Sequence, residues 1–225
     1  MKVILFGASG MVGQGVLREC LLDPDVEAVL AIGRRAALPP QPKLRELVHA
    51  DFTDFQPVED QLGGYDACFF CLGVSAAGMK EADYRQVTYG FTLAAAEVLA
   101  RRSPGMTFVY VSGTGTDSTE KGRAMWARVK GATENALLAL PFKAAYMFRP
   151  GIIQPLHGIK SRTPLYRVFY VAAAPILPVV RALFPRYVIT TEQVGRAMLE
   201  VAKRGADKKW IENSDIAALA AKGSS

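Results

Sequence analysis

The start of the chain constrains the fold more than any other segment. An apolar run, Lys2–Phe6, ends at the first of three glycines, Gly7, Gly10 and Gly13, and apolar residues then recur at helical spacing over Met11–Leu22. A buried strand, a glycine turn and a helix in this order are typical of a site for the diphosphate of a dinucleotide. One glycine makes the turn, one lets the backbone approach the phosphates, and one lets the helix pack closely on the strand.

The start of this helix would supply further contacts to the diphosphate. Backbone N–H groups in a first helical turn have no partner within the helix, so they can bind an anion. We expect Met11 and Val12 to lie at this position and the hydroxyl of Ser9 to add a donor. The alternative is a strand-to-helix turn that binds no ligand.

Two arginines favour NADP(H) over NAD(H). NAD sites place a carboxylate at the end of the second strand, where it binds the ribose 2′-hydroxyl. Here the apolar run Ala28–Gly33 is followed by Arg34 and Arg35, and guanidinium groups match a 2′-phosphate. NAD(H) stays open as the second choice, since two solvated arginines at a loop start would look the same.

Apolar strand segments alternate with helical segments through most of the chain. The expected strands are Lys2–Phe6, Ala28–Gly33, Glu46–Ala50, Ala67–Leu72, Met106–Ser112, Lys143–Arg149 and Lys209–Ile211. The expected helices are Met11–Leu22, Val58–Leu62, Glu81–Arg102, Arg123–Leu140, Thr190–Arg204 and a last one from Asn213 or Ser214 to Ala221. Continuously apolar strands indicate parallel βαβ units with helices on both faces. The predicted fold is therefore α/β, a Rossmann-type doubly wound parallel sheet with a small C-terminal lobe.

A chain of 225 residues suits one domain of this kind. We expect residues 1–225 to form a single NAD(P)-binding domain, with residues 150–190 as a substrate-covering insertion within it. Val168–Val180 carries no charge, but it is too short to span a membrane. It is expected to be a packed core or a contact between subunits of a homo-oligomer. The alternative is peripheral membrane contact, because Arg167, Arg181 and Arg186 flank it.

Charge and cysteine content limit which partners and which cellular compartment are expected. The net charge is +6, and Lys143–Lys209 holds twelve basic and three acidic residues, which favours an anionic partner such as a phosphate- or carboxylate-bearing substrate or an acidic lipid surface. The alternative is a basic surface that serves only solubility. No nucleic-acid-binding module is recognisable, so nucleic acid is not expected as a partner. Three cysteines cannot form a closed disulfide set, and no signal-peptide pattern precedes Lys2, so the expected location is cytoplasmic. Cys68 and Cys71 should point to opposite faces of a strand, so no redox or metal site is expected from them.

Two further segments are expected to border the dinucleotide. Asp51 and Phe52 follow the third expected strand, where the adenine would lie. Leu72 and Gly73 end the fourth strand, where the backbone must pass close to the cofactor.

Several motifs together resemble the atypical short-chain dehydrogenases/reductases. They are GASGMVG, the strand ends at Cys71-Leu72-Gly73 and Ser112, a later helical lysine, Lys130, and the turn Arg149-Pro150-Gly151. The stretch SGTGTDSTEKGRAMWARVKGATENAL narrows the resemblance to the NAD-dependent epimerase/dehydratase-like branch that also contains the Tat-interacting protein. The resemblance covers nearly the whole chain. It implies that Ser112 orients the substrate oxygen and that Lys130 and Pro150 contact the cofactor.

The chain departs from the family at the proton donor. The usual chemistry needs a tyrosine four residues before the lysine, because the lysine then shares its helix face and lowers its pKa. Here Trp126 stands at that position. An indole N–H only donates hydrogen bonds and cannot act as an acid or base near neutral pH.

Three explanations stay open for this departure. Another acid could act, either Tyr166, Tyr170 or His157 in the C-terminal part, or Asp117 and Glu120 in the loop before the helix. The assignment of Trp126 to the tyrosine position could be out of register. The protein could also bind NADP(H) without turnover. The expected function is an oxidoreductase or epimerase-like enzyme acting on a small anionic or carbonyl substrate, and the alternative is a non-catalytic NADP(H)-sensing regulator or interaction protein.

Overall fold

A seven-stranded parallel sheet forms the centre of the computed structural model, which describes residues 1–36, 38–159 and 187–223. The strand order is β3-β2-β1-β4-β5-β6-β9, and every neighbouring pair is parallel. The strands are β1 (Lys2–Phe6), β2 (Ala28–Gly33), β3 (Leu44–Val48), β4 (Ala67–Phe70), β5 (Thr107–Val111), β6 (Ala144–Arg149) and β9 (Trp210–Glu212). The predicted Rossmann-type fold is confirmed.

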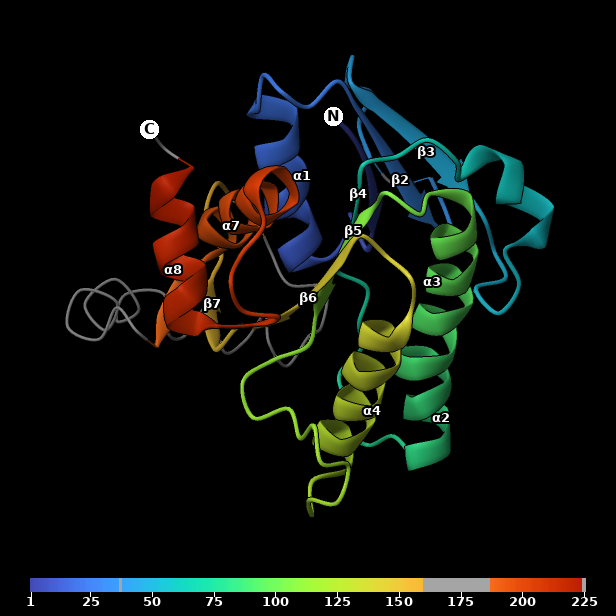
Figure 1. Cartoon of the computed structure of the whole chain (residues 1–225), viewed down its shortest axis with the longest axis vertical. Coiled ribbons are helices and arrows are strands. Elements are labelled where there is room, and N and C mark those ends of the chain that lie inside the picture. Colours follow the sequence, from blue (N-terminus) through green and yellow to red (C-terminus); the bar gives the residue numbers. More distant parts are fainter. Residues whose placement is uncertain (37, 160–186, 224–225) are drawn as a thin grey trace.

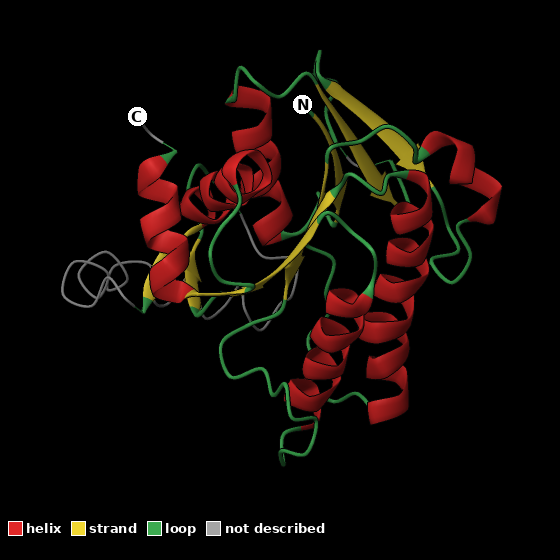
Figure 2. Ribbon diagram, in the orientation of Figure 1, coloured by secondary structure: helices red, strands yellow, loops and turns green. Residues whose placement is uncertain are grey.

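Helices cover both faces of this sheet (Figures 1 and 2). One face packs against α1 (Met11–Leu22), α7 (Thr191–Arg204) and α8 (Asn213–Lys222). The other face packs against α3 (Phe91–Arg102) and α4 (Met125–Ala139). A short 3₁₀ helix, Gln56–Gln61, contacts α3 as well.

Alternate residues of the strands enter two separate cores. Val3 and Leu5 of β1 belong to the core beneath α1 and α7, whereas Ile4 and Phe6 belong to the core beneath α3. Because both faces are buried, the strands need apolar residues at every position, as the sequence pattern predicted. Cys68 and Cys71 likewise contact different cores, which confirms that they point to opposite faces.

A π-helical turn, Gln86–Gly90, joins the short helix α2 (Glu81–Arg85) to α3. The predicted helix Glu81–Arg102 is therefore continuous in the structure, with this wider turn inside it.

Several predicted boundaries were wrong. β3 begins and ends two residues before the expected Glu46–Ala50, because its register on β2 pairs Val29 with Leu44 and Gly33 with Val48. The structure also contains two strands that were not predicted from the sequence, β7 (Ile152–Gln154) and β8 (Val188–Thr190), which pair in parallel in a second, two-stranded sheet. Ile152 and Val188 are far apart in the sequence, so their pairing leaves no local sequence pattern.

The order of the strands determines where a ligand can bind. The chain runs outward from β1 through β2 to β3, and then returns to build β4, β5 and β6 on the other side. The connections therefore diverge between β1 and β4, and ligands of such sheets bind outside the carboxyl ends of the strands at that point. The glycine turn, Arg34 and Ser112 follow β1, β2 and β5, so all lie at the carboxyl ends of the strands.

The loop that follows β5 packs directly on α4 at Gly131. A Cβ on Gly131 would lie 1.8 Å from the carbonyl oxygen of Asp117. We predict that Gly131→Ala lowers the free energy of unfolding by about 1–3 kcal/mol, the usual cost of overpacking. Helix propensity alone would favour alanine, so a loss reports the close contact. The control is Gly105→Ala, which has no atom within 4 Å of the added Cβ. Urea denaturation measures both, and a neutral Gly131→Ala would contradict the prediction.

Candidate functional site

The glycine turn between β1 and α1 is held against the end of β4. Gly7 has a φ of +77°, and a Cβ there would lie 2.7 Å from backbone atoms of Cys71 and Leu72. A Cβ on Gly13 would lie 2.1 Å from the carbonyl oxygen of Gly7. Only glycine therefore fits at these two positions, since each approaches another stretch of backbone.

Gly10 has a different role in the turn. Its nearest neighbour would be the Gly7 carbonyl oxygen, 3.3 Å from an added Cβ, so packing alone restricts it less. Gly10 is the N-cap of α1, and no side chain caps the helix there. The first N–H groups of α1, at Met11 and Val12, therefore lie uncapped beside a turn without side-chain bulk, an arrangement that fits a bound diphosphate.

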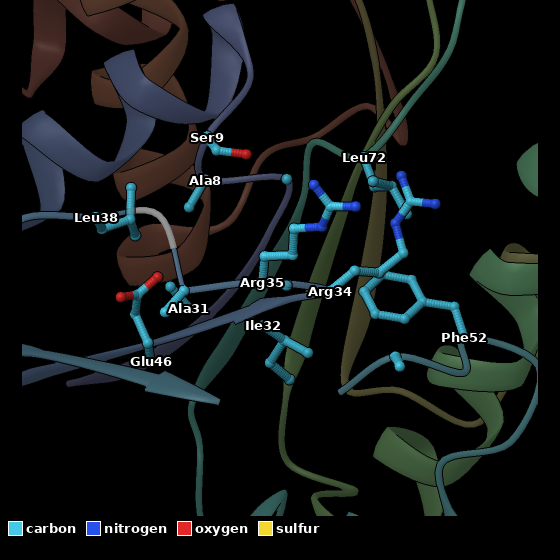
Figure 3. A pocket seen from close by; sticks show the side chains of 14 residues that line it. Ala8, Ser9, Ala31, Ile32, Arg34, Arg35, Leu38, Glu46, Phe52 and Leu72 are labelled. Atoms are coloured by element: carbon cyan, nitrogen blue, oxygen red, sulfur yellow. The ribbon is translucent and has the colours of Figure 1, made fainter. Parts of the chain in front are cut away.

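A cavity of about 720 Å³ extends from this turn along the ends of β2, β3 and β4 (Figure 3). Its lining includes Ser9, Arg34, Arg35, Glu46, Phe52 and Leu72. Its size suits the adenosine half of a dinucleotide.

Arg34 and Arg35 are both exposed at the rim of this cavity. Figure 3 shows both guanidinium groups extending toward the side where Leu72 lies. Among the described residues, neither forms a hydrogen bond or an ion pair. Two adjacent positive charges without protein partners form a good site for a phosphate.

A carboxylate that the sequence analysis missed also lines the cavity. Glu46 lies on β3, opposite Ala31 in the register of β2 and β3. Figure 3 places it beside Ala31 and Leu38, at the other end of the cavity from the two guanidinium groups. The dinucleotide-binding motif looks for an acidic residue at the end of β2, so it does not detect a glutamate within β3.

The other predicted cofactor residues lie at the same edge of the sheet. Phe52 is buried, lines the cavity and packs edge-on against Phe6, with ring centroids 6.0 Å apart. Asp51 is exposed, and its carboxylate accepts hydrogen bonds from the backbone and hydroxyl of Thr53, at 2.8 and 2.6 Å. Asp51 thus stabilises its own turn and is not part of the cavity lining. Gly73 has no atom within 4 Å of an added Cβ, so the space beside it is open.

Ser112 and Lys130 are in contact, although not through the serine hydroxyl. The Lys130 ammonium donates a hydrogen bond to the backbone carbonyl of Ser112. Burial lowers the pKa of Lys130 to about 8, and the negative charge of Glu134 opposes this shift. Lys130 is therefore mainly protonated at neutral pH, with its charge held at the end of β5.

The Ser112 hydroxyl belongs to a buried network instead. Ser112 is only 6% exposed, and its Oγ donates to Oε1 of Glu134 at 2.6 Å, with the Phe148 carbonyl 3.1 Å away. Glu134 is fully buried and forms two hydrogen bonds with the guanidinium of Arg149. The hydrogen bond and charge of Glu134 raise the pKa of Arg149. In this structure the Ser112 hydroxyl is thus not free to orient a substrate oxygen, contrary to what the resemblance implied.

Two residues of this network were not predicted from the sequence: Glu134, which accepts the hydrogen bond from Ser112, and Arg149, which pairs with Glu134. Glu134 lies four residues after Lys130, so both occupy one face of α4, and this spacing was the available signal. Arg149 was noted only as part of a turn. Pro150, which follows it, is buried, and its carbonyl accepts a hydrogen bond from the backbone N–H of Thr114 at 3.0 Å.

Trp126 packs over the loop that follows Ser112. A Cβ on Gly115, which has a φ of +87°, would lie 3.4 Å from Cη2 of the indole. Trp126 is partly exposed. It therefore presents an aromatic surface beside the loop that follows β5.

The other candidate acids are engaged elsewhere or lie outside the described residues. Hydrogen bonds from Thr119 and from the backbone of Gly122 lower the pKa of Asp117. Glu120 accepts a hydrogen bond from Asn135 at 2.8 Å. His157 lies 3.0 Å from Glu192 of α7, the helix on the opposite face of the sheet from α4. Tyr166, Tyr170 and the apolar stretch Val168–Val180 fall outside the described ranges.

Within the described ranges, no helix has both the length and the apolar character needed to cross a membrane.

Curated proteins with similar sequences cover about two thirds of the chain. It is 31% identical over 159 residues to the protein fmp52 of Emericella nidulans, which covers 68% of this chain and 66% of that protein. It is 29% identical over 153 residues to FMP52-2 of Scheffersomyces stipitis, covering 66% and 65%, and 28% identical over 155 residues to HTATIP2 of Rattus norvegicus, covering 68% and 62%. The chain thus matches slightly less than two thirds of the length of these relatives. No family model matches it.

The fungal relatives are named as mitochondrial proteins. This finding contradicts the cytoplasmic location expected from the sequence. The lack of a recognisable signal-peptide pattern and the few cysteines were not a sufficient basis for that expectation.

Solved structures share the fold at low sequence identity. The Bordetella bronchiseptica enzyme WbmF in complex with NAD⁺ superposes with a TM-score of 0.68 at 16% identity, over 99% of this chain and 77% of that one. A short-chain dehydrogenase family protein from Francisella tularensis gives a TM-score of 0.64 at 17% identity, over 96% and 98%.

The Glu134–Arg149 pair allows a test of how much the buried network stabilises the fold. We predict that Arg149→Met lowers the free energy of unfolding by about 3–5 kcal/mol, because it leaves the Glu134 charge buried without its partner. Adding Glu134→Leu should restore part of the loss, since Ser112 can still donate to the Phe148 carbonyl. As a control, Arg102→Met breaks an exposed pair with Asp60 and should cost about 1 kcal/mol or less. Denaturant titration of the four proteins measures this, and a double variant less stable than Arg149→Met would refute it.

Proposed function

We propose that this chain, which belongs to the atypical short-chain dehydrogenases/reductases, binds NADP(H) and catalyses hydride transfer to or from a small anionic or carbonyl substrate. The observation that best supports the choice of cofactor is the pair of guanidinium groups, Arg34 and Arg35, which line the cavity beside the glycine turn and have no partner within the described ranges. They would neutralise a 2′-phosphate, which NAD(H) lacks.

Different residues of the site would bind different parts of the cofactor. The uncapped start of α1 would hold the diphosphate at Gly10, Met11 and Val12, while Ser9 adds a hydroxyl. Phe52 and Leu72 would border the adenosine half. The nicotinamide, when bound, supplies or accepts the hydride.

Lys130 would supply positive charge on the substrate side. Its ammonium is fixed to the Ser112 carbonyl at the carboxyl end of β5, which neighbours β4 and lies two strands from β1 and its glycine turn. A charge fixed before reaction begins stabilises negative charge that develops on a substrate oxygen. The proposal keeps residues 150–190 on the substrate side, because Pro150 and Gly151 follow β6 at its carboxyl end; residues 160–186 of this segment lie outside the described ranges.

We predict that Arg34→Ala and Arg35→Ala each weaken binding of NADPH by about 10- to 100-fold, the value of a charge-assisted hydrogen bond. Binding of NADH should change little, because it has no 2′-phosphate. Arg204→Ala is the matched control, since Arg204 lies on α7 outside the cavity and is 67% exposed. Isothermal titration calorimetry measures the affinity of each protein for NADPH and for NADH. Equal affinity of the wild type for both cofactors, unchanged in the variants, would contradict the assignment.

A non-catalytic NADP(H)-sensing regulator is the second candidate function, and Trp126 in the proton-donor position favours it. Absorbance of the reduced nicotinamide, followed over a panel of aldehydes, ketones and quinones, separates the two. Tight binding of NADPH with no oxidation of it across the panel would favour the regulator.

We predict that Trp126→Tyr raises the rate of ketone reduction at least about tenfold, because a general acid typically contributes 10²–10⁴-fold. The new phenol would lie one helical turn from Lys130, whose positive charge would lower the pKa of the phenol. Trp210→Tyr is the control, since Trp210 lies at the outer edge of the sheet on β9. Steady-state kinetics with cyclohexanone measures the change. No gain in a folded Trp126→Tyr protein that still binds NADPH would show that the site lacks more than an acid.

A further inference from the structure

We propose that Glu134 is a positioning residue that keeps the Lys130 side chain charged and fixed in place, and that Ser112 is the link between the two. This inference rests on the proposed function, which uses the Lys130 ammonium as a fixed positive charge. It follows from three features: the contacts of Ser112 with both side chains, the complete burial of Glu134 and the pairing of Glu134 with Arg149.

Ser112 contacts α4 at two points that lie one helical turn apart. The Lys130 ammonium donates a hydrogen bond to the backbone carbonyl of Ser112, and the Ser112 hydroxyl donates to Oε1 of Glu134 at 2.6 Å. Residues four apart lie on the same face of a helix, so these two contacts and the intervening turn of α4 form a closed ring. The position of Lys130 thus depends on the contact that Glu134 makes as well as on its own hydrogen bond.

Arg149 keeps Glu134 ionised in the interior. Its guanidinium donates two hydrogen bonds to the Glu134 carboxylate, one of them from Nε at 3.0 Å. A fully buried carboxyl would otherwise hold its proton, because burial disfavours the charged form. Arg149 also donates to the Ser118 hydroxyl and to Glu212, at 3.4 Å, so its own charge is well engaged. The negative charge of Glu134 is therefore present although its side chain is fully buried.

This negative charge counteracts the cost of burying the Lys130 ammonium. Burial lowers the pKa of Lys130 to about 8, and the charge of Glu134 acts in the opposite direction. Without Glu134 the pKa of Lys130 would fall further, toward the range in which the ammonium loses its proton at neutral pH. The proposed function needs that proton to stay on Lys130, so it depends on the carboxylate one turn away.

Other ionisable groups near this part of α4 do not take over this role. Among the described residues, those that lie on the neighbouring elements and are not exposed are Tyr84 of α2, Tyr89 of the π-helical turn, Tyr110 of β5, Asp117 of the loop before α4 and Arg149 of β6. Burial raises the pKa of Tyr110, so this phenol stays neutral at the pH values at which Lys130 titrates. The Asp117 carboxylate is engaged within its own loop. Removal of Glu134 should therefore change the ionisation of Lys130 more than removal of any of these groups.

Nuclear magnetic resonance of the full chain tests this inference directly. Lysines labelled with carbon-13 at Cε give one signal each, and the Lys130 signal is identified by its loss in Lys130→Met. The midpoint of its titration should lie at about pH 8 in the wild type and about one pH unit lower in Glu134→Gln. Glutamine has the size of glutamate and can still accept the hydrogen bond from Ser112, so this variant removes the charge alone.

Three further variants separate the effect of charge from that of structure. Glu81→Gln is the matched control, because it removes a half-exposed carboxylate that pairs with Arg128 of α4 at 2.8 Å, and its Lys130 midpoint should stay within about 0.2 pH units of the wild type. Glu134→Asp retains the charge, so its midpoint should lie within about 0.5 pH units of the wild type. Ser112→Ala removes a buried hydrogen bond but no charge, so it should lower stability and move the midpoint less than Glu134→Gln does.

A second way to remove the carboxylate keeps the test decisive. If Glu134→Gln does not fold, the double variant Glu134→Leu, Arg149→Met takes its place, because it removes the carboxylate together with the guanidinium that pairs with it. The Lys130 midpoint should again fall by about one pH unit, since the negative charge is missing from this protein too.

The outcomes separate this inference from the function on which it rests. A folded protein that lacks the carboxylate but keeps the wild-type midpoint of Lys130 would overturn the inference, whether or not it binds NADPH. A fall in Glu81→Gln or Ser112→Ala as large as that in Glu134→Gln would also overturn it, because the fall would then report a general loosening of the site. The expected midpoints in a protein that binds no NADPH by calorimetry would support the link between Glu134 and Lys130 and overturn the proposed function alone.

Discussion

The close approach of the glycine turn to the end of β4 determines where everything else in this molecule can lie. At Gly7 the chain leaves β1 with a positive φ and passes so near Cys71 and Leu72 that no side chain fits. Gly13 then lets α1 pack against the same turn. These two contacts bring the start of a helix to the point where the sheet reverses its strand order, and the exposed backbone N–H groups there suit the diphosphate of the proposed cofactor.

A second constraint acts in the half of the sheet that contains β5 and β6, and it comes from buried charges rather than from glycines. Glu134 and Arg149 join α4 to β6 in the interior, and Ser112 completes the link to β5. A buried pair of this kind contributes less to stability than its short distances suggest, because both groups lose their hydration. Its clearer effect is geometric, since it fixes the loop carrying Thr114 and Gly115 relative to the helix carrying Trp126 and Lys130.

Local and periodic features were readable from the sequence, and contacts between distant segments were not. Lys2–Phe6 and its glycines predicted a strand, a turn and a helix because each signal lies within a few residues. The pairing of β7 with β8 escaped notice, since Ile152 and Val188 have no local pattern in common. Glu46 lines the cavity only because the register of β3 places it there. The engagement of the Ser112 hydroxyl depends on Glu134 and on β6, so a motif at the end of β5 could not disclose it.

The two outer strands of the sheet differ in what they offer to another chain. β3 extends over five residues and exposes Val48, whereas β9 has only three residues, Trp210–Glu212. A strand that short presents few unpaired backbone groups, so the sheet offers little template for extension beyond β9. Growth of the sheet into a larger assembly by strand addition would therefore be least favourable at its C-terminal border.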